Sequence, residues 1–274
     1  MKKHRKPRKR RKTRKKRKTV EEKYENIKIL VAATLVILIS AISSYMLYAM
    51  YSSPQPKTAL IIDGLSVEFN NKEFIDKITY YFKEAGYDVE IYNGTEVTVD
   101  TYRKMFSSKY RVIILRVHSA PGDGVIVPKN AIVFFTGERT RVKKYFTEQL
   151  IGFVVKAKTL TRAESFYAVT PSFIRNTPGK LENAVVIVLS CYGTLGSITI
   201  EAFMSKGATV YIGWNGEVSP EYMDKAGLYL IENLVVKRLS VDEAVRETML
   251  EVGPDPFFGS YLEYYPPNAG SYKL

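Results

Sequence analysis

The longest uninterrupted apolar stretch covers residues 29–50 (ILVAATLVILISAISSYMLYAM) and includes no charged side chain. As an α-helix this stretch would be about 33 Å long, enough to cross a hydrocarbon core of about 30 Å. Tyr45, Tyr48 and Tyr51 lie near its end, where aromatic side chains favour the membrane interface. A cleaved signal peptide would have a shorter apolar region and a small-x-small site. The pattern therefore predicts a transmembrane signal anchor, with a buried helix of a soluble domain as the alternative.

Lysine and arginine dominate the segment before this helix. Residues 1–28 contain 16 basic and 3 acidic side chains, whose composition predicts a disordered tail. Basic flanking residues stay in the cytoplasm, so we expect a single-pass cell-membrane protein with a cytoplasmic N-terminus and an extracytoplasmic domain. The tail is expected to bind lipids of the anionic cytoplasmic leaflet. Tethering RNA or ribosomes is the competing use of the same charges.

The charge of the rest of the chain is balanced. Residues 29–274 contain 25 basic and 25 acidic side chains, so the net charge of +13 belongs to the tail. We therefore do not expect nucleic acid as a partner of the folded part. Residues 51–57 (YSSPQPK) form a linker, and residues 58–274 are long enough for one domain with a substantial core.

Within this domain, short apolar runs alternate with segments of helical periodicity. The apolar runs predict strands at 57–63, 87–92, 110–117, 131–136, 166–169, 184–190 and 208–213. Apolar spacing of three and four residues predicts helices at 71–85, 101–107, 139–150, 198–205, 220–237 and 241–252, with a helical turn after Thr170. This alternation is typical of an α/β fold with a mostly parallel sheet and helices on both faces. No element is predicted for the Tyr- and Pro-rich residues 254–274.

Several kinds of chemistry lack the residues that they need. Cys191 is the only cysteine and the chain has only two histidines, so a disulfide and a zinc site of His and Cys ligands are not expected. A Walker A loop and a Gly-x-Ser-x-Gly elbow are absent, and a cysteine phosphatase would need arginine where Ser197 stands. We expect neither a metal nor a cofactor.

Two reactive side chains follow predicted strands. His118 follows the strand at 110–117, and Cys191 follows the strand at 184–190. Ligands of parallel sheets bind beyond the carboxyl ends of the strands, so both residues are expected at the same edge. A thiol beside an imidazole can ionise and act as a nucleophile, with the histidine as the proton donor to the leaving group.

Structural roles compete with this interpretation. A lone cysteine can be a small buried apolar residue, and His118 can be a hydrogen-bonded structural side chain. The loops 119–124 and 192–197 are rich in small residues, which allow a substrate carbonyl to approach backbone N–H groups, although ordinary turns use the same residues.

The two strand ends also resemble a known family. VIILRVHS (112–119) and AVVIVLSCYGTLGS (184–197) are similar to the caspase-like cysteine peptidase superfamily, which includes caspases, legumain, gingipains, clostripain, separase and CHAT domains. Residues 201–249 resemble the CHAT and gingipain-like branch most, and the whole resemblance covers about residues 110–250.

The resemblance implies a caspase-haemoglobinase fold and peptide-bond hydrolysis through a thioester. It makes His118 the general acid and base, Cys191 the nucleophile, and the N–H groups of Ser119 and Cys191 the oxyanion hole. Ser119 stands where the family usually has glycine, and Ser190 directly precedes the cysteine, unlike the CHAT branch. These departures leave an inactive relative as an alternative.

Other residues are candidates for contacts with a substrate or for modification. Asp63, Glu138 and Glu217 could bind a Lys or Arg side chain of a substrate, although each could equally be a solvated surface carboxylate. Trp214 could line a substrate cleft or pack in the core. Asn93 belongs to the only N-glycosylation sequon, Asn-Gly-Thr.

The sequence therefore predicts a membrane-anchored cysteine endopeptidase with a peptide or protein substrate. The alternatives are a catalytically inactive caspase-like module that binds a partner at the membrane, and a polybasic membrane tether for nucleic acid or ribosomes.

Overall fold

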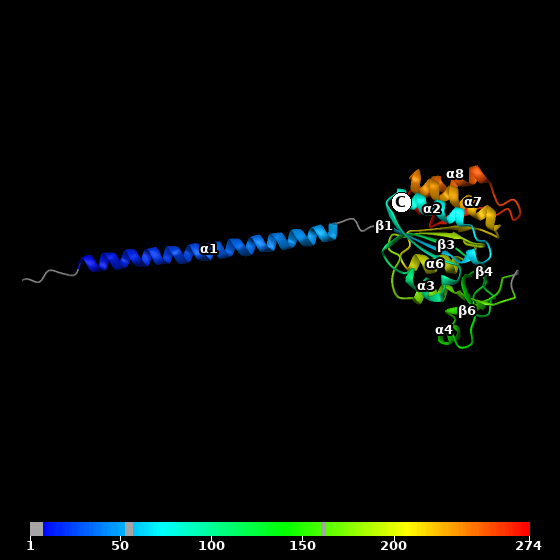
Figure 1. Ribbon diagram of the computed structural model, residues 1–274, viewed down its shortest axis with the longest axis horizontal. Helices are drawn as coiled ribbons and strands as arrows, with labels where there is room; N and C mark the ends of the chain where they lie inside the picture. Colours follow the sequence, from blue (N-terminus) through cyan, green and yellow to red (C-terminus); the bar gives the residue numbers. More distant parts are fainter. Residues whose placement is uncertain (1–7, 53–56, 160–162) are drawn as a thin grey trace, which may run out of the picture. The chain divides into compact units, whose positions relative to one another are not determined.

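The computed structural model describes residues 8–52, 57–159 and 163–274 of the chain (Figure 1). The chain consists of two compact units, one up to residue 55 and one from residue 56 onward. We describe each unit by itself.

The described residues of the first unit form a single helix, α1 (Arg8–Ser52). Its part from Glu21 to Tyr48 is long and apolar enough to cross a membrane, and the side chains of this part are exposed. The helix begins inside the basic tail, for which the composition predicts disorder. Lys and Arg are good helix formers, and extending an existing helix by one residue costs far less than nucleating a new one. The apolar segment can therefore propagate its helix into the basic residues.

The second unit contains a six-stranded sheet, which we call sheet A. Its order is β2 (Tyr87–Asn93), β1 (Lys57–Asp63), β3 (Tyr110–Arg116), β8 (Val185–Leu189), β9 (Val210–Trp214) and β10 (Leu262–Tyr265). All neighbours are parallel except β10, which runs antiparallel to β9. The mostly parallel sheet of an α/β fold is thus confirmed. Strand β10 lies in the Tyr- and Pro-rich segment, where the sequence pattern predicts no element.

Helices cover both faces of sheet A (Figure 1). One face packs against α2 (Lys72–Glu84), α7 (Pro220–Ile231) and α8 (Val241–Val252), and α7 continues into a π-helical turn, η3 (Glu232–Val236). The other face packs against α3 (Val99–Lys104), α5 (Pro171–Asn176) and α6 (Ser197–Ser205). Alternate residues of β1 point into the two cores: Ala59 and Ile61 into the first, Leu60 and Ile62 into the second. Burial on both faces explains why the central strands are continuous apolar runs.

A second sheet, sheet B, is inserted between β3 and β8. Its strands are antiparallel in the order β4 (Ser119–Pro121), β5 (Ile132–Arg139), β7 (Phe166–Val169) and β6 (Val154–Ala157). Ile132 and Phe134 join the second core of sheet A. Three short 3-10 helices complete the domain: η1 (Gly64–Val67), η2 (Gly94–Glu96) and η4 (Pro267–Ala269).

The helix predicted at 139–150 is only partly present. Strand β5 extends to Arg139, and the helix α4 covers only Phe146–Leu150. Lys143 and Tyr145 have φ angles of 67° and 54°, which an α-helix does not allow. The phenol of Tyr167 holds this loop by accepting from Arg141 N–H (2.9 Å) and donating to the Arg141 carbonyl (2.9 Å). Tertiary hydrogen bonds therefore override the local helical periodicity.

The last residues of the chain cap a helix. The N–H of Val241 donates to the carbonyl of Tyr272 (3.0 Å), and that of Asp242 donates to the carbonyl of Gly270 (2.9 Å). Both N–H groups belong to the first turn of α8, where no intrahelical acceptor exists. The C-terminal segment thus has a structural role in completing α8.

A buried ion cluster lies at the carboxyl edge of sheet A. The side chain of Arg116, at the end of β3, is 0 % exposed. Its guanidinium donates to Asp63 at the end of β1 (2.6 Å), to both oxygens of Asp224 on α7 (2.6 and 2.7 Å) and to the carbonyl of Phe69 (2.8 Å). Burial lowers the pKa of Arg116, but the hydrogen bonds and negative charges of Asp224 and Asp63 together outweigh it and raise the pKa, so the guanidinium stays charged inside the protein. One side chain thus joins two strands, a helix and a loop.

Replacing Arg116 with leucine should lower the free energy of unfolding by about 3–5 kcal/mol, because two buried carboxylates lose their counter-charge. Chemical denaturation of the detergent-solubilised chain, followed by the fluorescence of the buried Trp214, measures this change. Arg246→Leu is the matched control, since Arg246 is 55 % exposed and pairs with Asp242 at the surface. It should cost less than about 1 kcal/mol. Equal effects of the two substitutions would contradict the role of the buried cluster.

Candidate active site

His118 and Cys191 leave the same edge of sheet A from neighbouring strands. β3 pairs in parallel with β8, and the pairing reaches Arg116 opposite Leu189. It continues one step further, because the N–H of Val117 donates to the carbonyl of Leu189 (3.3 Å). The next segments also touch: the Ser119 hydroxyl donates to the carbonyl of Cys191, and its oxygen lies 3.0 Å from the Ser190 hydroxyl oxygen. The pairing therefore brings the histidine segment beside the cysteine segment.

The imidazole of His118 lies between a carboxylate and two aromatic rings. Its Nε2 is 3.5 Å from Oε2 of Glu68, and the ring centroids of Phe69 and Phe135 lie 6.1 and 6.0 Å away. The Glu68 side chain is only 9 % exposed and also accepts from the Thr159 hydroxyl (3.3 Å). Glu68 is thus placed to orient the imidazole and to stabilise its protonated form.

Sequence reasoning missed Glu68. The residue follows the 3-10 helix after β1, outside any recognisable motif. The available signal was its position: it lies in the segment after the first strand, at the edge where Asp63 and His118 were expected. A carboxylate close to that edge is a candidate partner for the histidine.

Cys191 is partly buried and its thiol is neutral in the resting protein. Sγ donates to the carbonyl of Val218 at 3.6 Å. Burial is the main cause that raises the pKa of the Cys191 thiol. The backbone of Val218 is the next largest and lowers it, while the carboxylates of Glu217 and Asp255 raise it further. A neutral thiol needs a base to remove its proton before it can attack a carbonyl.

The backbone directly after His118 offers a donor. The N–H of Phe135 donates to the carbonyl of His118 (2.9 Å), which makes Ser119 and Phe134 a non-hydrogen-bonded pair of the β4–β5 ladder. The N–H of Ser119 therefore points away from β5. An N–H that the sheet does not use is what an oxyanion hole requires.

The loop after Cys191 is held in a strained conformation. Tyr192 has a φ of 57°, which costs a residue with a side chain roughly 1–3 kcal/mol. Its N–H donates to the carbonyl of Gly216 (2.7 Å). A Cβ atom on Gly193 would lie 3.0 Å from the backbone N of Trp214, so only glycine fits there without a shift. The loop is thus fixed against the end of β9.

Of the three acidic candidates, Glu217 lies beside the thiol. It is exposed, it raises the pKa of Cys191, and it accepts a hydrogen bond from the Tyr192 hydroxyl. Burial, together with this carboxylate, raises the pKa of Tyr192 to about 12. Asp63 is instead 1 % exposed and bound to Arg116, and Glu138 pairs with Lys144 and accepts from the Tyr145 hydroxyl (3.0 Å).

The two remaining candidates, Trp214 and Asn93, lie in the core and at the surface, respectively. Trp214 is 0 % exposed and packs against Tyr222, with its ring centroid 5.8 Å away, so it belongs to the core. Asn93 is exposed at the end of β2, where a glycosylating enzyme could reach its side chain.

No family model matches this chain, and no curated protein is similar to it at a significant level. Among residues 8–52, 57–159 and 163–274, no group of three or more His, Cys, Asp and Glu side chains is placed to hold a metal ion.

Because the pKa of Cys191 is raised, we expect its thiol to react slowly with an alkylating reagent at neutral pH. Because only the thiolate is alkylated, the rate of modification by iodoacetamide should keep rising above pH 8.5, about the ordinary pKa of cysteine. The measurement is simple because the chain has one cysteine. The same thiol in the denatured chain is the control, and it should react faster at neutral pH. A rate that reaches its plateau below pH 7 would show a preformed thiolate–imidazolium pair and contradict the neutral thiol.

Proposed function

We propose that this protein is a membrane-anchored cysteine endopeptidase with a caspase-like domain. The observation that carries the proposal is the parallel pairing of β3 with β8, which brings the segments of His118 and Cys191 into contact. The strained loop after the cysteine and the carboxylate beside the histidine support it further, since both are frequent features of catalytic sites.

The proposed reaction begins with a proton transfer. His118 accepts the proton of the Cys191 thiol, and the sulfur attacks the carbonyl carbon of the scissile peptide bond. The N–H groups of Ser119 and Cys191 stabilise the negative oxygen that forms. The imidazolium then gives its proton to the leaving amine, the C–N bond breaks, and a thioester remains.

A water molecule completes the cycle. His118 removes a proton from this water, which attacks the thioester carbonyl and releases the second product and the thiol. Glu68 lies 3.5 Å from Nε2 of His118, so it orients the ring and stabilises the imidazolium in both halves of the reaction. Because the thiol is neutral at rest, its deprotonation accompanies the attack.

The charge beside the thiol suggests which peptides are cleaved. Glu217 is exposed next to Cys191, and its negative charge attracts a Lys or Arg side chain preceding the scissile bond. Asp63 and Glu138 are already paired with basic residues of the chain, so the proposal assigns the specificity to Glu217.

The proposed location follows from α1. The helix would cross the cell membrane once, with the basic N-terminus in the cytoplasm and the peptidase domain outside it. Strand β1 enters the domain at the amino edge of sheet A, while His118 and Cys191 lie at the carboxyl edge, one strand length or about 23 Å away.

An inactive module that binds a partner is the second candidate. The observation that favours it is the neutral, partly buried thiol, which donates to Val218. Such a protein would keep the fold and lack the turnover, so the assay below separates the two candidates.

The detergent-solubilised full chain should hydrolyse fluorogenic peptides with Lys or Arg before the scissile bond, and not those with Asn or Asp. Cys191→Ala should abolish the activity, and His118→Gln should lower kcat by a factor of about 10²–10⁴ because the general base is lost. Glu217→Gln should lower kcat/KM for the Lys and Arg peptides about fivefold, the effect of one partly solvated ion pair.

Glu221→Gln is the matched control for the last variant, since Glu221 is an exposed carboxylate in the first turn of α7. It should leave kcat/KM unchanged. Equal rates for the wild type and Cys191→Ala on all four peptide classes would contradict the peptidase and leave the inactive module.

A further inference from the structure

Charge is unevenly distributed in the domain: the segment that forms most of sheet B is basic, and the remainder is acidic. Residues 119–159 contain seven basic and three acidic side chains, a net charge of +4. The other residues from 57 onward contain eighteen basic and twenty-two acidic side chains, a net charge of −4. The two net charges cancel, so the net charge of the whole domain does not reveal this basic lobe (residues 119–159).

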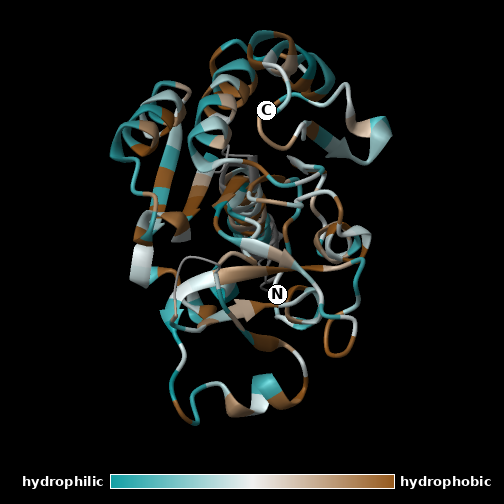
Figure 2. Ribbon diagram, turned by 90° about the vertical axis from the view of Figure 1, so that its right-hand side faces the viewer, coloured by the Kyte–Doolittle hydropathy of each residue, from teal (hydrophilic) through white to brown (hydrophobic). Residues whose placement is uncertain are grey.

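The same lobe presents apolar side chains to solvent. Six large apolar residues of sheet B and its loops are more than half exposed, and we call them the apolar patch: Val125 (89 %), Ile126 (62 %), Val142 (92 %), Phe146 (65 %), Leu150 (76 %) and Ile151 (53 %). In Figure 2 the loops at the lower end of the domain show brown apolar stretches between teal polar ones. Exposed apolar residues that gather on one lobe mark an interaction site.

Basic residues border the apolar patch. Arg141 and Lys143 flank Val142 directly in the sequence. Lys156 and Lys158 line a groove of about 580 Å³ together with Ile126. The Cγ2 atom of Ile126 also lies within 3.9 Å of the Cβ position of Gly152, which follows the patch residue Ile151. In this groove an exposed apolar side chain and two lysines share one surface, and two further basic residues adjoin Val142.

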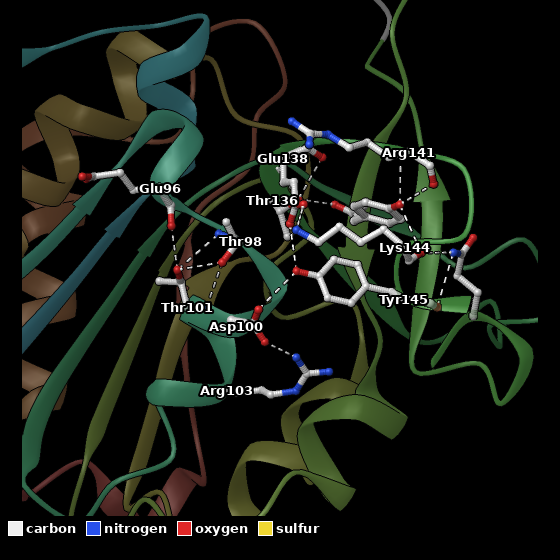
Figure 3. A network of polar contacts seen from close by, with 12 residues as sticks. Glu96, Thr98, Asp100, Thr101, Arg103, Thr136, Glu138, Arg141, Lys144 and Tyr145 are labelled. Atoms are coloured by element: carbon white, nitrogen blue, oxygen red, sulfur yellow. Dashed lines mark hydrogen bonds and ion pairs between the residues drawn. The ribbon is translucent and has the colours of Figure 1, made fainter. Parts of the chain in front are cut away.

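Hydrogen bonds and ion pairs hold the loop that carries Val142 (Figure 3). The hydroxyl of Tyr145 donates to Glu138 (3.0 Å) and lies 3.4 Å from the Asp100 carboxylate of α3. Arg103 binds both Asp100 and, at 2.7 Å, Glu148 of α4. The residue before α4, Tyr145, keeps its positive φ inside this network. These hydrogen bonds and ion pairs therefore hold the loop in a strained conformation in which the side chain of Val142 is exposed to water.

We propose that this basic and apolar surface docks on the anionic lipid headgroups of the bilayer that α1 enters. Apolar side chains that insert at the headgroup level, bordered by Lys and Arg, are the combination that interfacial membrane binding uses. The occupant follows from two features of the chain: the lobe has the charge complementary to anionic headgroups, which in the proposed topology are those of the outer leaflet, and a helix able to cross a membrane ends five residues before β1. Docking would hold the domain against the membrane and fix the direction in which the edge with His118 and Cys191 faces.

The test places a tryptophan in the patch of the full chain. Phe146→Trp, reconstituted into vesicles that contain brominated anionic lipid, should lose emission because bromine quenches a nearby indole. In brominated zwitterionic vesicles the loss should be smaller. Neutralising Arg141 and Lys143 with glutamine should lower the ratio of docked to undocked domain about fivefold for each side chain. The native Trp214 is fully buried and gives a constant background.

Leu250→Trp is the matched control, because Leu250 is 72 % exposed on α8. This helix packs on the face of sheet A opposite to the face that sheet B contacts. Its emission should not change with bromination. Flotation of each variant with the vesicles confirms that α1 is inserted. Unquenched Phe146→Trp on floating vesicles, or equal quenching of both variants, would overturn the docking surface. Failure to float would overturn the anchor and the docking with it.

Discussion

Arg116 is a full positive charge enclosed in protein two residues before the histidine of the candidate site. A buried guanidinium is tolerated only if carboxylates and carbonyls surround it, and here Asp63, Asp224 and Phe69 do so. These partners come from β1, α7 and the segment before α2. The requirement to neutralise one charge therefore fixes three parts of the chain around the end of β3.

This constraint determines the geometry of the site. The end of β3 cannot move without breaking the ion cluster, and β3 is hydrogen-bonded to β8, so the segments of His118 and Cys191 are held at one edge. The carbonyl of Phe69, bound by Arg116, adjoins Glu68, and Glu68 and Phe69 both contact the imidazole. The same guanidinium thus positions the strand that carries the histidine and the loop that carries its carboxylate.

The sequence pattern predicts the parts of the fold that local physics determines. Central strands such as β8 are continuous apolar runs because both faces are buried, and their ends place His118 and Cys191 at one edge. Strands β4, β6 and β10 are short and lie at sheet edges, where pairing partners rather than apolar pattern decide the conformation. The helix expected at 139–150 is shortened for the same reason, since Tyr167 holds its first residues in a loop. Glu68 and Asp224 are far apart in sequence from the groups they serve, so only the folded structure shows their roles.

The proposed reaction requires that folding brings the imidazole of His118 face to face with the thiol of Cys191. The most direct measurement is cross-linking of the full chain with 1,3-dibromoacetone, which bridges a thiol and an imidazole only when the two are neighbours. Mass spectrometry of the digested protein should find one linked pair of peptides, containing Cys191 and His118, and none after denaturation. Cys191 alkylated without any link to His118, in the folded chain and at a pH where the thiol reacts, would contradict the account.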